Sequence, residues 1–215
     1  MMSIYIQAPY QLSFAEDHEH RALLQAYIQH EYGRQFNALI PHFLPYLLGM
    51  YRADGVLVGA CGLNRADNSV LYLERYLDAP IEEVAVAQTG IILPRNRLVE
   101  IGNFACSESG NARIMFAAIC RLLYENQFEY VAFTGTKKLR NIFHRLHLTP
   151  LELAPALPDR MGEDAQAWGE YYQGQPCVMV GDLKQGRQIL SETSLLLSLF
   201  GPMPDIFPVQ MSVQL

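Results

Sequence analysis

The chain has 215 residues, which is enough for one domain with a well-filled hydrophobic core. Apolar residues make up 50% of it and charged residues 18%, the profile of an ordinary globular protein. The net charge of −6 argues against nucleic acid as the main partner, and no uncharged apolar run approaches the roughly 18 residues that a membrane-spanning helix needs.

The amino terminus has no basic segment followed by a long apolar core, so it does not predict a secretory signal. The four cysteines lie far apart and form no CxxC pair, which favours buried thiols over disulfides or a zinc site. We therefore expect a cytoplasmic protein with no metal ion, no nucleic-acid partner and no transmembrane segment.

The first third of the chain predicts a strand, a helix and a hairpin. Residues 3–8 have the pattern of a short strand, and residues 14–32 that of an amphipathic helix. The hairpin has arms at Tyr46–Arg52 and residues 56–63, and residues 53–55 form its Asp-Gly turn.

The middle of the chain predicts a strand-turn-helix unit around which the rest is arranged. A third strand at residues 70–76 closes the meander, and a helix that begins within residues 78–83 ends at Thr89-Gly90. The unit itself has a buried strand at Leu98–Cys106, a polar turn at 107–112 and a helix at 113–124.

The remaining elements complete one sheet. They are a strand at residues 129–136 parallel to Leu98–Cys106, a helix at 139–148, a proline-bearing connection at 149–159 and a last strand at 177–181. This order predicts an α+β fold, with a mostly antiparallel sheet, one parallel strand pair and flanking helices. We expect one domain at residues 1–187, followed by a helical stub and a Pro-rich tail at 188–215.

The turn after the buried strand carries the pattern S-x-x-G-x-A. A glycine-bearing turn that leads into a helix presents unpaired backbone N–H groups at the positive end of the helix dipole, where a phosphate can bind. The alternative is a helix capped by Ser107 or Ser109, with Gly110 serving only the turn. The longer motifs GxGxxG and GxxxxGKS/T do not occur in the sequence.

This pattern resembles the pyrophosphate loop Q/R-x-x-G-x-G/A of the GNAT acyltransferases, and the order of elements is similar to theirs. In that fold the parallel strands splay apart, and an acyl-pantetheine amide chain fills the unpaired N–H and C=O groups as a strand would. The resemblance implies a pocket between residues 101–106 and 132–136. It also implies an acyl-CoA or acyl carrier protein thioester held by Phe104, Cys106, Ser109, Gly110, Asn111, Ala112, Arg113 and Thr134.

Four separated segments, in the right order, resemble the thermostable haemolysin family. They are LYLERYLDAPIE (residues 71–82), VEIGNFA (99–105), FTGT (133–136) and WGEYY (168–172). That family in turn resembles the acyl-homoserine-lactone synthases. VEIGNFA is similar to their E-I/L-S-R-F strand, with Glu100 at the acid and Asn103 at the place of the arginine.

The resemblance implies an enzyme that transfers an acyl group to an amine-bearing small molecule. Arg34 and Phe36 are similar to an Arg and a Phe in the N-terminal segment of the synthases, and with Glu74 and Tyr172 they are the candidate substrate contacts. No tightly bound cofactor is expected, because the phosphopantetheine thioester acts as a cosubstrate. An acyl carrier protein is a candidate partner, and a homodimer is a candidate assembly.

Acyl transfer to an amine needs a base that takes a proton from the attacking ammonium. Glu100 is the candidate base, because a carboxylate on a mostly apolar strand should have a raised pKa or a specific partner. The alternative role for Glu100 is a structural ion pair with Arg95, Arg97 or Arg113.

The thioester oxygen also needs a hydrogen-bond donor. Strand alternation places Glu100 and Asn103 on opposite faces, so both reach one pocket only if a bulge lies near Gly102. The GNAT resemblance implies such a bulge near Gly102 and Asn103, and with it Asn103 would offer a backbone or side-chain amide to the thioester carbonyl. Hydrogen bonding within the strand is the alternative.

Three further groups of residues each allow two interpretations. Tyr171 or Tyr172 could protonate the leaving thiolate, or pack as aromatic side chains. His144 and His147 could bind a metal ion together, or lie on a solvated face. Cys106 could have a lowered thiol pKa beside the helix terminus, or be a buried inert thiol.

Two function classes remain. The first is an acyltransferase that uses a CoA or carrier-protein thioester. The second is a membrane-active haemolysin, in which residues 195–200 and the Pro-rich tail insert at a membrane interface. Thermal stabilisation by thioesters, measured against leakage of liposomes, separates the two.

Overall fold

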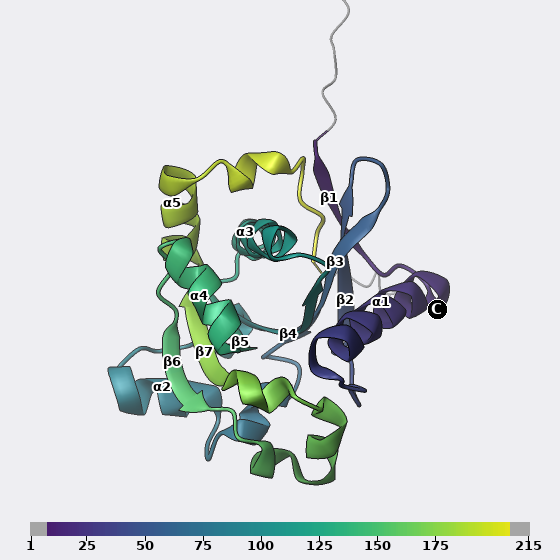
Figure 1. Ribbon diagram of the computed structural model, residues 1–215. Helices are drawn as coiled ribbons and strands as arrows, with labels where there is room; N and C mark the ends of the chain where they lie inside the picture. The colour runs from purple at the N-terminus through teal and green to yellow at the C-terminus, as the bar shows by residue number, and fades with distance from the viewer. Residues whose placement is uncertain (1–7, 207–215) are drawn as a thin grey trace, which may run out of the picture.

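A single seven-stranded sheet organises the computed structural model, which describes residues 8–206 (Figure 1). The strands are β1 (Tyr10–Phe14), β2 (Tyr46–Arg52), β3 (Leu57–Arg65), β4 (Leu98–Cys106), β5 (Tyr130–Gly135), β6 (Leu151–Pro155) and β7 (Cys177–Asp182). They lie in the order β1-β2-β3-β4-β5-β7-β6, and among these neighbours only β4 and β5 are parallel. The predicted α+β fold with one parallel strand pair is confirmed.

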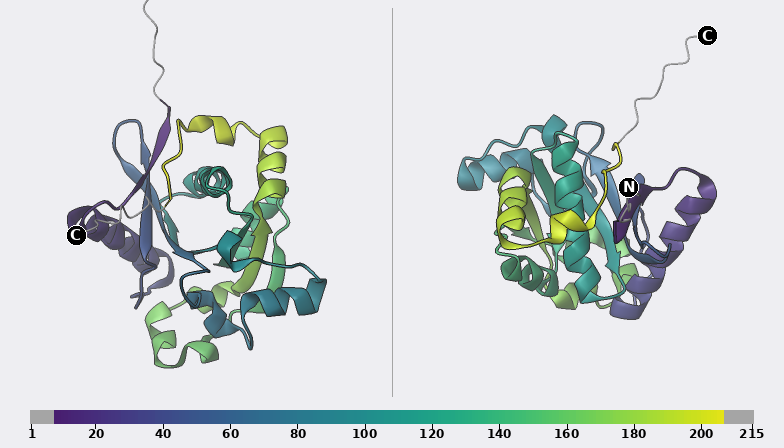
Figure 2. Two further views of the ribbon diagram at one scale, coloured as in Figure 1. Left: turned by 180° about the vertical axis from the view of Figure 1, so that it is seen from behind. Right: turned by 90° about the horizontal axis from the view of Figure 1, so that it is seen from above.

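Helices cover both faces of the sheet (Figure 2). On one face α1 (His18–Phe36) packs on β2, β3 and β4, and on the other lie α3 (Ser109–Glu125), α4 (Lys137–Arg145) and α5 (Leu183–Thr193). The helix α2 (Ile81–Thr89) and the 3-10 helix η1 (Tyr72–Tyr76) share a core cluster with β4, β5, β6 and β7. Four further 3-10 helices are η2 (Arg95–Arg97), η3 (Pro158–Trp168), η4 (Tyr171–Gly174) and η5 (Leu196–Leu199).

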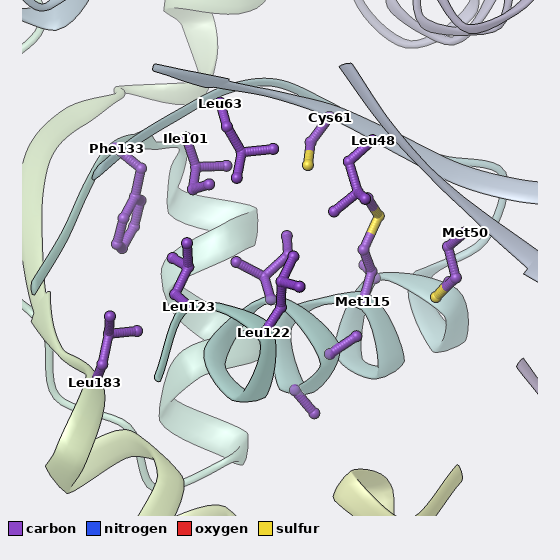
Figure 3. Packing of buried hydrophobic residues seen from close by; sticks show 14 of the residues in the cluster. Leu48, Met50, Cys61, Leu63, Ile101, Met115, Leu122, Leu123, Phe133 and Leu183 are labelled. Carbon is purple, nitrogen blue, oxygen red and sulfur yellow. The ribbon is translucent and has the colours of Figure 1, made fainter. Parts of the chain in front are cut away.

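The largest core cluster lies between α3 and the sheet (Figure 3). Met115, Leu122 and Leu123 of α3 point toward β3, where Cys61 and Leu63 face them, and all five side chains are buried. Burying a leucine-sized side chain contributes about 1.5–3 kcal/mol relative to leaving it exposed. The apolar stripe of α3 therefore fixes this helix beneath the centre of the sheet.

Two helices begin at residues other than those predicted. α1 starts at His18 because the side chain of Asp17 accepts a hydrogen bond of 2.7 Å from the backbone N–H of His20. α3 starts at Ser109, four residues earlier than predicted, and its N-cap residue is Glu108, whose side chain makes no capping hydrogen bond. The expected caps Ser107 and Ser109 are therefore wrong.

The parallel strands β4 and β5 part in the middle of the sheet. They pair from Leu98 with Tyr130 to Ile101 with Phe133, and beyond that point β4 continues to Cys106 and β5 to Gly135 without pairing to each other. The parting of the strands near residues 101 and 134 was predicted and is confirmed. Backbone groups that face such a gap lack the partners that a continuous sheet would give them.

A β-bulge lies on β4 at the same place. In the pairing of β3 with β4, Gly62 is opposite Gly102 and Ala60 is opposite Ala105, so β4 has two residues where β3 has one. Asn103 has a φ of 50°, in the left-handed region. The bulge predicted near Gly102 is confirmed, and it places Asn103 on the same face of the sheet as Glu100.

Two predictions about the strands are wrong. Residues 70–76 do not form a strand, because η1 (Tyr72–Tyr76) turns the chain there and the backbone N–H groups of Tyr72 and Leu73 bond to a carboxylate on β4. Residues 149–159 are not only a connection, because β6 (Leu151–Pro155) adds an edge strand beside β7. Proline is tolerated in an edge strand, where a missing N–H need not break a ladder bond.

The ends of the chain extend past the described residues. The predicted strand at 3–8 lies outside them except for Ala8, and β1 is the first strand that the structure describes. α5 spans residue 187, where a domain boundary is predicted, and that division stays a prediction. The Pro-rich tail lies outside the described residues from 207 onward.

Candidate active site

A cavity of about 320 Å³ occupies the gap between β4 and β5. Residues 101–104 of β4 and residues 133 and 134 of β5 line it, where the two strands no longer pair. Residues from both faces of the sheet also line it, so the cavity passes through the sheet. Its volume is in the range of small-molecule sites, roughly 300–1,000 Å³. The predicted position of the pocket is confirmed.

The cavity has two parts, one on each face of the sheet. The α3-side chamber is lined by Phe104, Phe116, Ile119, Phe133, Leu139 and Phe143. The α1-side chamber is lined by Tyr32, His42, Tyr72, Glu100, Trp168 and Tyr171.

The α3-side chamber is walled by aromatic rings in close contact. The rings of Phe104 and Phe116 stack with centroids 4.4 Å apart, and those of Phe116 and Phe143 lie 4.6 Å apart. Phe133 of β5 contacts Phe143 at 5.2 Å. These rings offer no group that a polar ligand could bond, so this part of the cavity suits a hydrocarbon chain. The polar side chains of Thr149, Asp182 and Gln185 also line the cavity.

Glu100 is a buried carboxylate in the wall of the α1-side chamber, with 2% of its surface exposed. Burial raises its pKa to about 7, against the lowering effect of its hydrogen bonds. The backbone N–H groups of Tyr72 and Leu73 donate to its two oxygens at 2.9 and 2.8 Å, so η1 holds the carboxylate in one orientation. A carboxyl group with this pKa can exchange a proton near neutral pH.

The alternative ion pair of Glu100 is not observed within residues 8–206. Arg95 instead bonds Glu74 at 2.8 Å and Glu82 at 2.7 Å, and Arg97 lies 3.9 Å from Glu129. The partners of Glu100 are two backbone N–H groups and the side chain of Asn64, which orient the carboxylate without supplying a full positive charge. Its use as a base stays a prediction.

The side chain of Asn103 holds the loop at residues 42–44. Its Oδ1 accepts from the backbone N–H of Leu44 at 2.8 Å, and its Nδ2 donates to the carbonyl of His42 at 2.9 Å. These bonds join β4 to a different segment, so the alternative of bonding within the strand is wrong for this side chain. The donation of an amide of Asn103 to a thioester stays a prediction.

His42 is the residue of the α1-side chamber that sequence patterns missed. Its Nε2 lies 3.4 Å from Oδ2 of Asp164, and its ring centre is 5.9 Å from that of Tyr72. The hydrogen bond with Arg75 is the main reason why the pKa of Asp164 is below its ordinary value. Because His42 and Asp164 lie in distant segments, no local spacing indicated their pairing.

The predicted phosphate-binding residues form the first turn of α3. Ser109, Gly110, Asn111, Ala112 and Arg113 all lie there, and none of them lines the cavity. The first turn of a helix has backbone N–H groups that the helix itself leaves unpaired, and the N-cap side chain does not satisfy them here. Their role in holding a phosphate stays a prediction.

Cys106 lies at the end of β4 and does not line the cavity. Burial raises the pKa of its thiol above the ordinary value, and its Sγ is 3.7 Å from Sδ of Met115. This environment is that of an inert thiol, because a reactive cysteine needs a lowered pKa.

Thr134 and two tyrosines occupy different positions at the gap. Thr134 lines the cavity, and its Oγ1 accepts a hydrogen bond of 3.3 Å from the hydroxyl of Tyr171, which lines the cavity as well. Tyr172 lies outside the cavity lining, and its hydroxyl is 2.9 Å from that of Tyr76. Of the two candidate acids, Tyr171 is therefore the one in position.

The remaining predicted substrate contacts do not line the cavity. Arg34 pairs with Glu31 at 2.6 Å, and Phe36 contacts the ring of Tyr171 from behind at 5.4 Å. Burial acts to raise the pKa of Glu74, but Arg95 and two backbone N–H groups outweigh it and hold that pKa below its ordinary value. For these three residues, direct substrate contact stays a prediction.

The remaining candidate features of the sequence concern metal binding and membrane insertion. The predicted pair His144 and His147 does not share a helix, because α4 ends at Arg145 and His147 has a φ of 56°. Within residues 8–206, no three His, Cys, Asp or Glu side chains gather closely enough to hold a metal ion. None of the helices in this range has both the length and the apolar character needed to cross a membrane.

Comparisons with known proteins agree with this architecture. The sequence model of a family described as thermostable hemolysin matches residues 14–187. No curated protein matches the sequence. Among solved structures, the chain is similar to FeeM, an N-acyl amino acid synthase from uncultured soil microbes, at 13% identity and a TM-score of 0.57 over 87% of this chain and 98% of that one.

Two further solved structures are acyl-homoserine-lactone synthases. LasI is 12% identical with a TM-score of 0.56 over 93% of this chain and 98% of that one. MesI, a CoA-dependent synthase, is 15% identical with a TM-score of 0.52 over 90% and 98%. At such identities these likenesses show a shared fold, and they confirm the predicted GNAT-like architecture and the resemblance to acyl-homoserine-lactone synthases.

Proposed function

The chain belongs to the thermostable hemolysin family, and we propose that it is an acyltransferase that moves an acyl group from a phosphopantetheine thioester to an amine. The observation that carries the proposal is the cavity through the β4–β5 gap, with an apolar chamber on one face and a buried carboxylate on the other. Such a cavity brings the thioester carbon to the gap, within reach of groups on both faces.

The donor lies along the gap in this proposal. The backbone groups of residues 102–106 that face away from β3 bond the amides of the pantetheine arm, as a neighbouring strand would. The acyl tail enters the α3-side chamber, and the phosphate groups lie toward the first turn of α3. Acyl-CoA and acyl carrier protein present the same arm, and the CoA-dependent synthase MesI supports the first of these.

The acceptor reaches the thioester from the α1-side chamber. Glu100 takes a proton from the ammonium, and the free amine nitrogen attacks the thioester carbon. A C–N bond forms and the C–S bond breaks, and the nitrogen releases its second proton to solvent as the amide forms. The thiolate takes a proton from solvent or from the Tyr171 hydroxyl, which solvent then reprotonates. The pKa of Glu100, about 7, lets it accept that proton near neutral pH.

The proposal is tested by thermal stabilisation and by thiol release. An acyl-CoA that fills the α3-side chamber should raise the melting temperature more than CoA alone, because binding to the folded state adds RT ln(1 + [L]/Kd) to its stability. Free thiol should appear only when an amine is also present. The absence of any stabilisation by acyl-CoA or acyl carrier protein would contradict the proposal.

The lytic alternative depends on residues 195–200. Leu195 is 82% exposed, but Phe200 is 7% exposed and packs in the core cluster beneath α3. Arg121 of α3 donates to the carbonyls of Leu197 and Phe200 at 3.1 Å each, which ties the segment to the domain. Liposome leakage that disappears on deletion of residues 188–215, without any response to thioesters, would favour lysis over acyl transfer.

A further inference from the structure

An amino acid ligand needs a cationic partner for its carboxylate, and the charged groups at the cavity do not supply one. Glu100 lies in the wall of the α1-side chamber, and Asp164 lies next to His42 at the same chamber. No Lys or Arg from residues 8–206 lines the cavity, and the residues outside that range contain neither type. The lining of the chamber therefore offers the carboxylate of Glu100 and no side-chain cation that is permanently charged.

Arg75, which lies beside the chamber, is already paired. Nη1 of Arg75 bonds Oδ2 of Asp164 at 3.0 Å, and its guanidinium lies 5.2 Å from the ring centre of Tyr72. The charge of Asp164 thus cancels that of Arg75 at the chamber. A carboxylate brought here from water would lose its hydration without gaining a cationic partner, which is strongly unfavourable.

Aromatic rings supply the remaining wall. The ring centre of Trp168 lies 5.2 Å from that of Tyr171 and 6.4 Å from that of Tyr72. The faces of such rings attract an ammonium group, most strongly where water is excluded. The rings and Glu100 together favour a ligand with a positive charge.

Two polar atoms in this wall lack a hydrogen bond of good geometry. Within residues 8–206, the only such buried side-chain atoms are the hydroxyl of Tyr72 and Nε1 of Trp168, which lie close enough to interact weakly with each other. The indole N–H can only donate. A neutral oxygen of a ligand, in a carbonyl or hydroxyl group, would satisfy this donor without adding a negative charge.

From these observations we infer that the acceptor is a primary amine without a free carboxylate, such as an amino acid amide, an amino alcohol or a simple amine. The role of this amine as acyl acceptor rests on the proposed acyl transfer. Its binding in the α1-side chamber does not depend on that proposal. The inference separates this chain from an N-acyl amino acid synthase such as FeeM. It assigns the α1-side chamber as the amine site and Trp168 as part of its wall.

The test uses the fact that Trp168 is the single tryptophan of the chain. Its fluorescence is titrated, without any thioester, with two matched sets of ligands: phenylalanine, phenylalaninamide and phenethylamine, and leucine, leucinamide and isoamylamine. The amides and amines should bind at least about tenfold more tightly than the matching amino acids, a difference of about 1.4 kcal/mol. Equal or tighter binding of the amino acids would overturn the inference, and so would unchanged emission with all six ligands.

A variant that leaves the positive charge of Arg75 without its acidic partner gives a second test. Asp164→Asn removes the acid that neutralises this arginine, so the preference for amine over amino acid should fall about fivefold. The matched control is Asp54→Asn, which removes the acid of another surface pair, with Arg52 at 2.7 Å, outside the cavity. The same change in both variants, or in neither, would contradict the assignment of the site.

The binding test also separates this inference from the proposed function. Amine-selective binding without thiol release from any thioester would end the transferase proposal and leave the ligand class standing. Thiol release that is fastest with amino acids would support the transferase and overturn the ligand class.

Discussion

The two chambers meet at one gap in the sheet but are built from different parts of the chain. The α3-side chamber is walled mainly by apolar side chains that project from regular helices and strands. The α1-side chamber consists of polar and aromatic side chains, several of which lie in loops and 3-10 helices. The first chamber can select a ligand by size, and the second can select it by charge and carry out proton transfer.

The largest expected effect comes from removing the carboxylate of the α1-side chamber. Glu100→Gln keeps the shape of the side chain but cannot take a proton, so turnover should fall by about 10²- to 10⁴-fold. Binding of an acyl thioester should remain, because the α3-side chamber is untouched. Glu129→Gln, an exposed acid away from the cavity, is the control. Unchanged turnover in Glu100→Gln would remove Glu100 as the base.

The second effect is a dependence of stability and activity on pH that results from the titration of Glu100. Its pKa is raised from 4.5 to about 7 on folding, so the folded state holds this proton more tightly than the unfolded state. The contribution to stability is therefore complete below pH 4.5, and roughly 3 kcal/mol is lost as pH rises to 7. Activity should change in the opposite direction, rising as the carboxylate ionises.

Denaturant unfolding from pH 4 to 8 measures this dependence against Glu100→Gln. The variant should lack the loss of stability across the window, and its residual activity should lack the rise around pH 7. An identical pH dependence of stability in the two proteins would show that the pKa of Glu100 is not raised.

The third effect is a loss of stability when the loop at residues 42–44, which lines the α1-side chamber, loses its bonds to β4. Asn103→Ala removes both bonds to residues 42–44 and leaves a buried N–H and a partly buried C=O without their partner, which should cost about 1–3 kcal/mol. Thermal unfolding measures the loss, with Asn68→Ala on the surface as the control. If the melting temperatures of both variants equal that of the unaltered protein, Asn103 does not hold the loop.

The smallest effect comes from filling the α3-side chamber. Ile119→Trp places a larger ring in a wall residue that is 4% exposed, so the longest accepted acyl chain should shorten, with at least about a tenfold loss for long donors. Rates with short and long acyl-CoA measure the change, and Val86→Trp on the exposed face of α2 is the control. An equal loss for all chain lengths would indicate damage to the fold rather than to the chamber.

The two chambers also differ in how much of each could be predicted from the sequence. The apolar spacing of α3 and the buried run of β4 indicated the centre of the fold. The helix and the strand follow from local periodicity, which a sequence shows directly. The bulge that brings Glu100 and Asn103 to one face was predicted from the GNAT resemblance, because alternation alone places these two residues on opposite faces.

The α1-side chamber was less predictable because long-range contacts define it. Residues 72–76 have the apolar pattern of a strand, but the carboxylate of Glu100 captures two of their backbone N–H groups and favours a 3-10 turn. His42 and Trp168 come from segments without regular pattern, and tertiary contacts bring them together. Tertiary contacts of this kind override local propensity.

The central claim is that a thioester arm lies between β4 and β5. The most direct measurement is the electron density of a complex with a non-hydrolysable acyl-pantetheine analogue. The account predicts the amide arm beside residues 102–106, with its acyl tail among Phe116, Phe133 and Phe143. An analogue bound away from this gap, or a gap closed by the protein's own side chains, would contradict it.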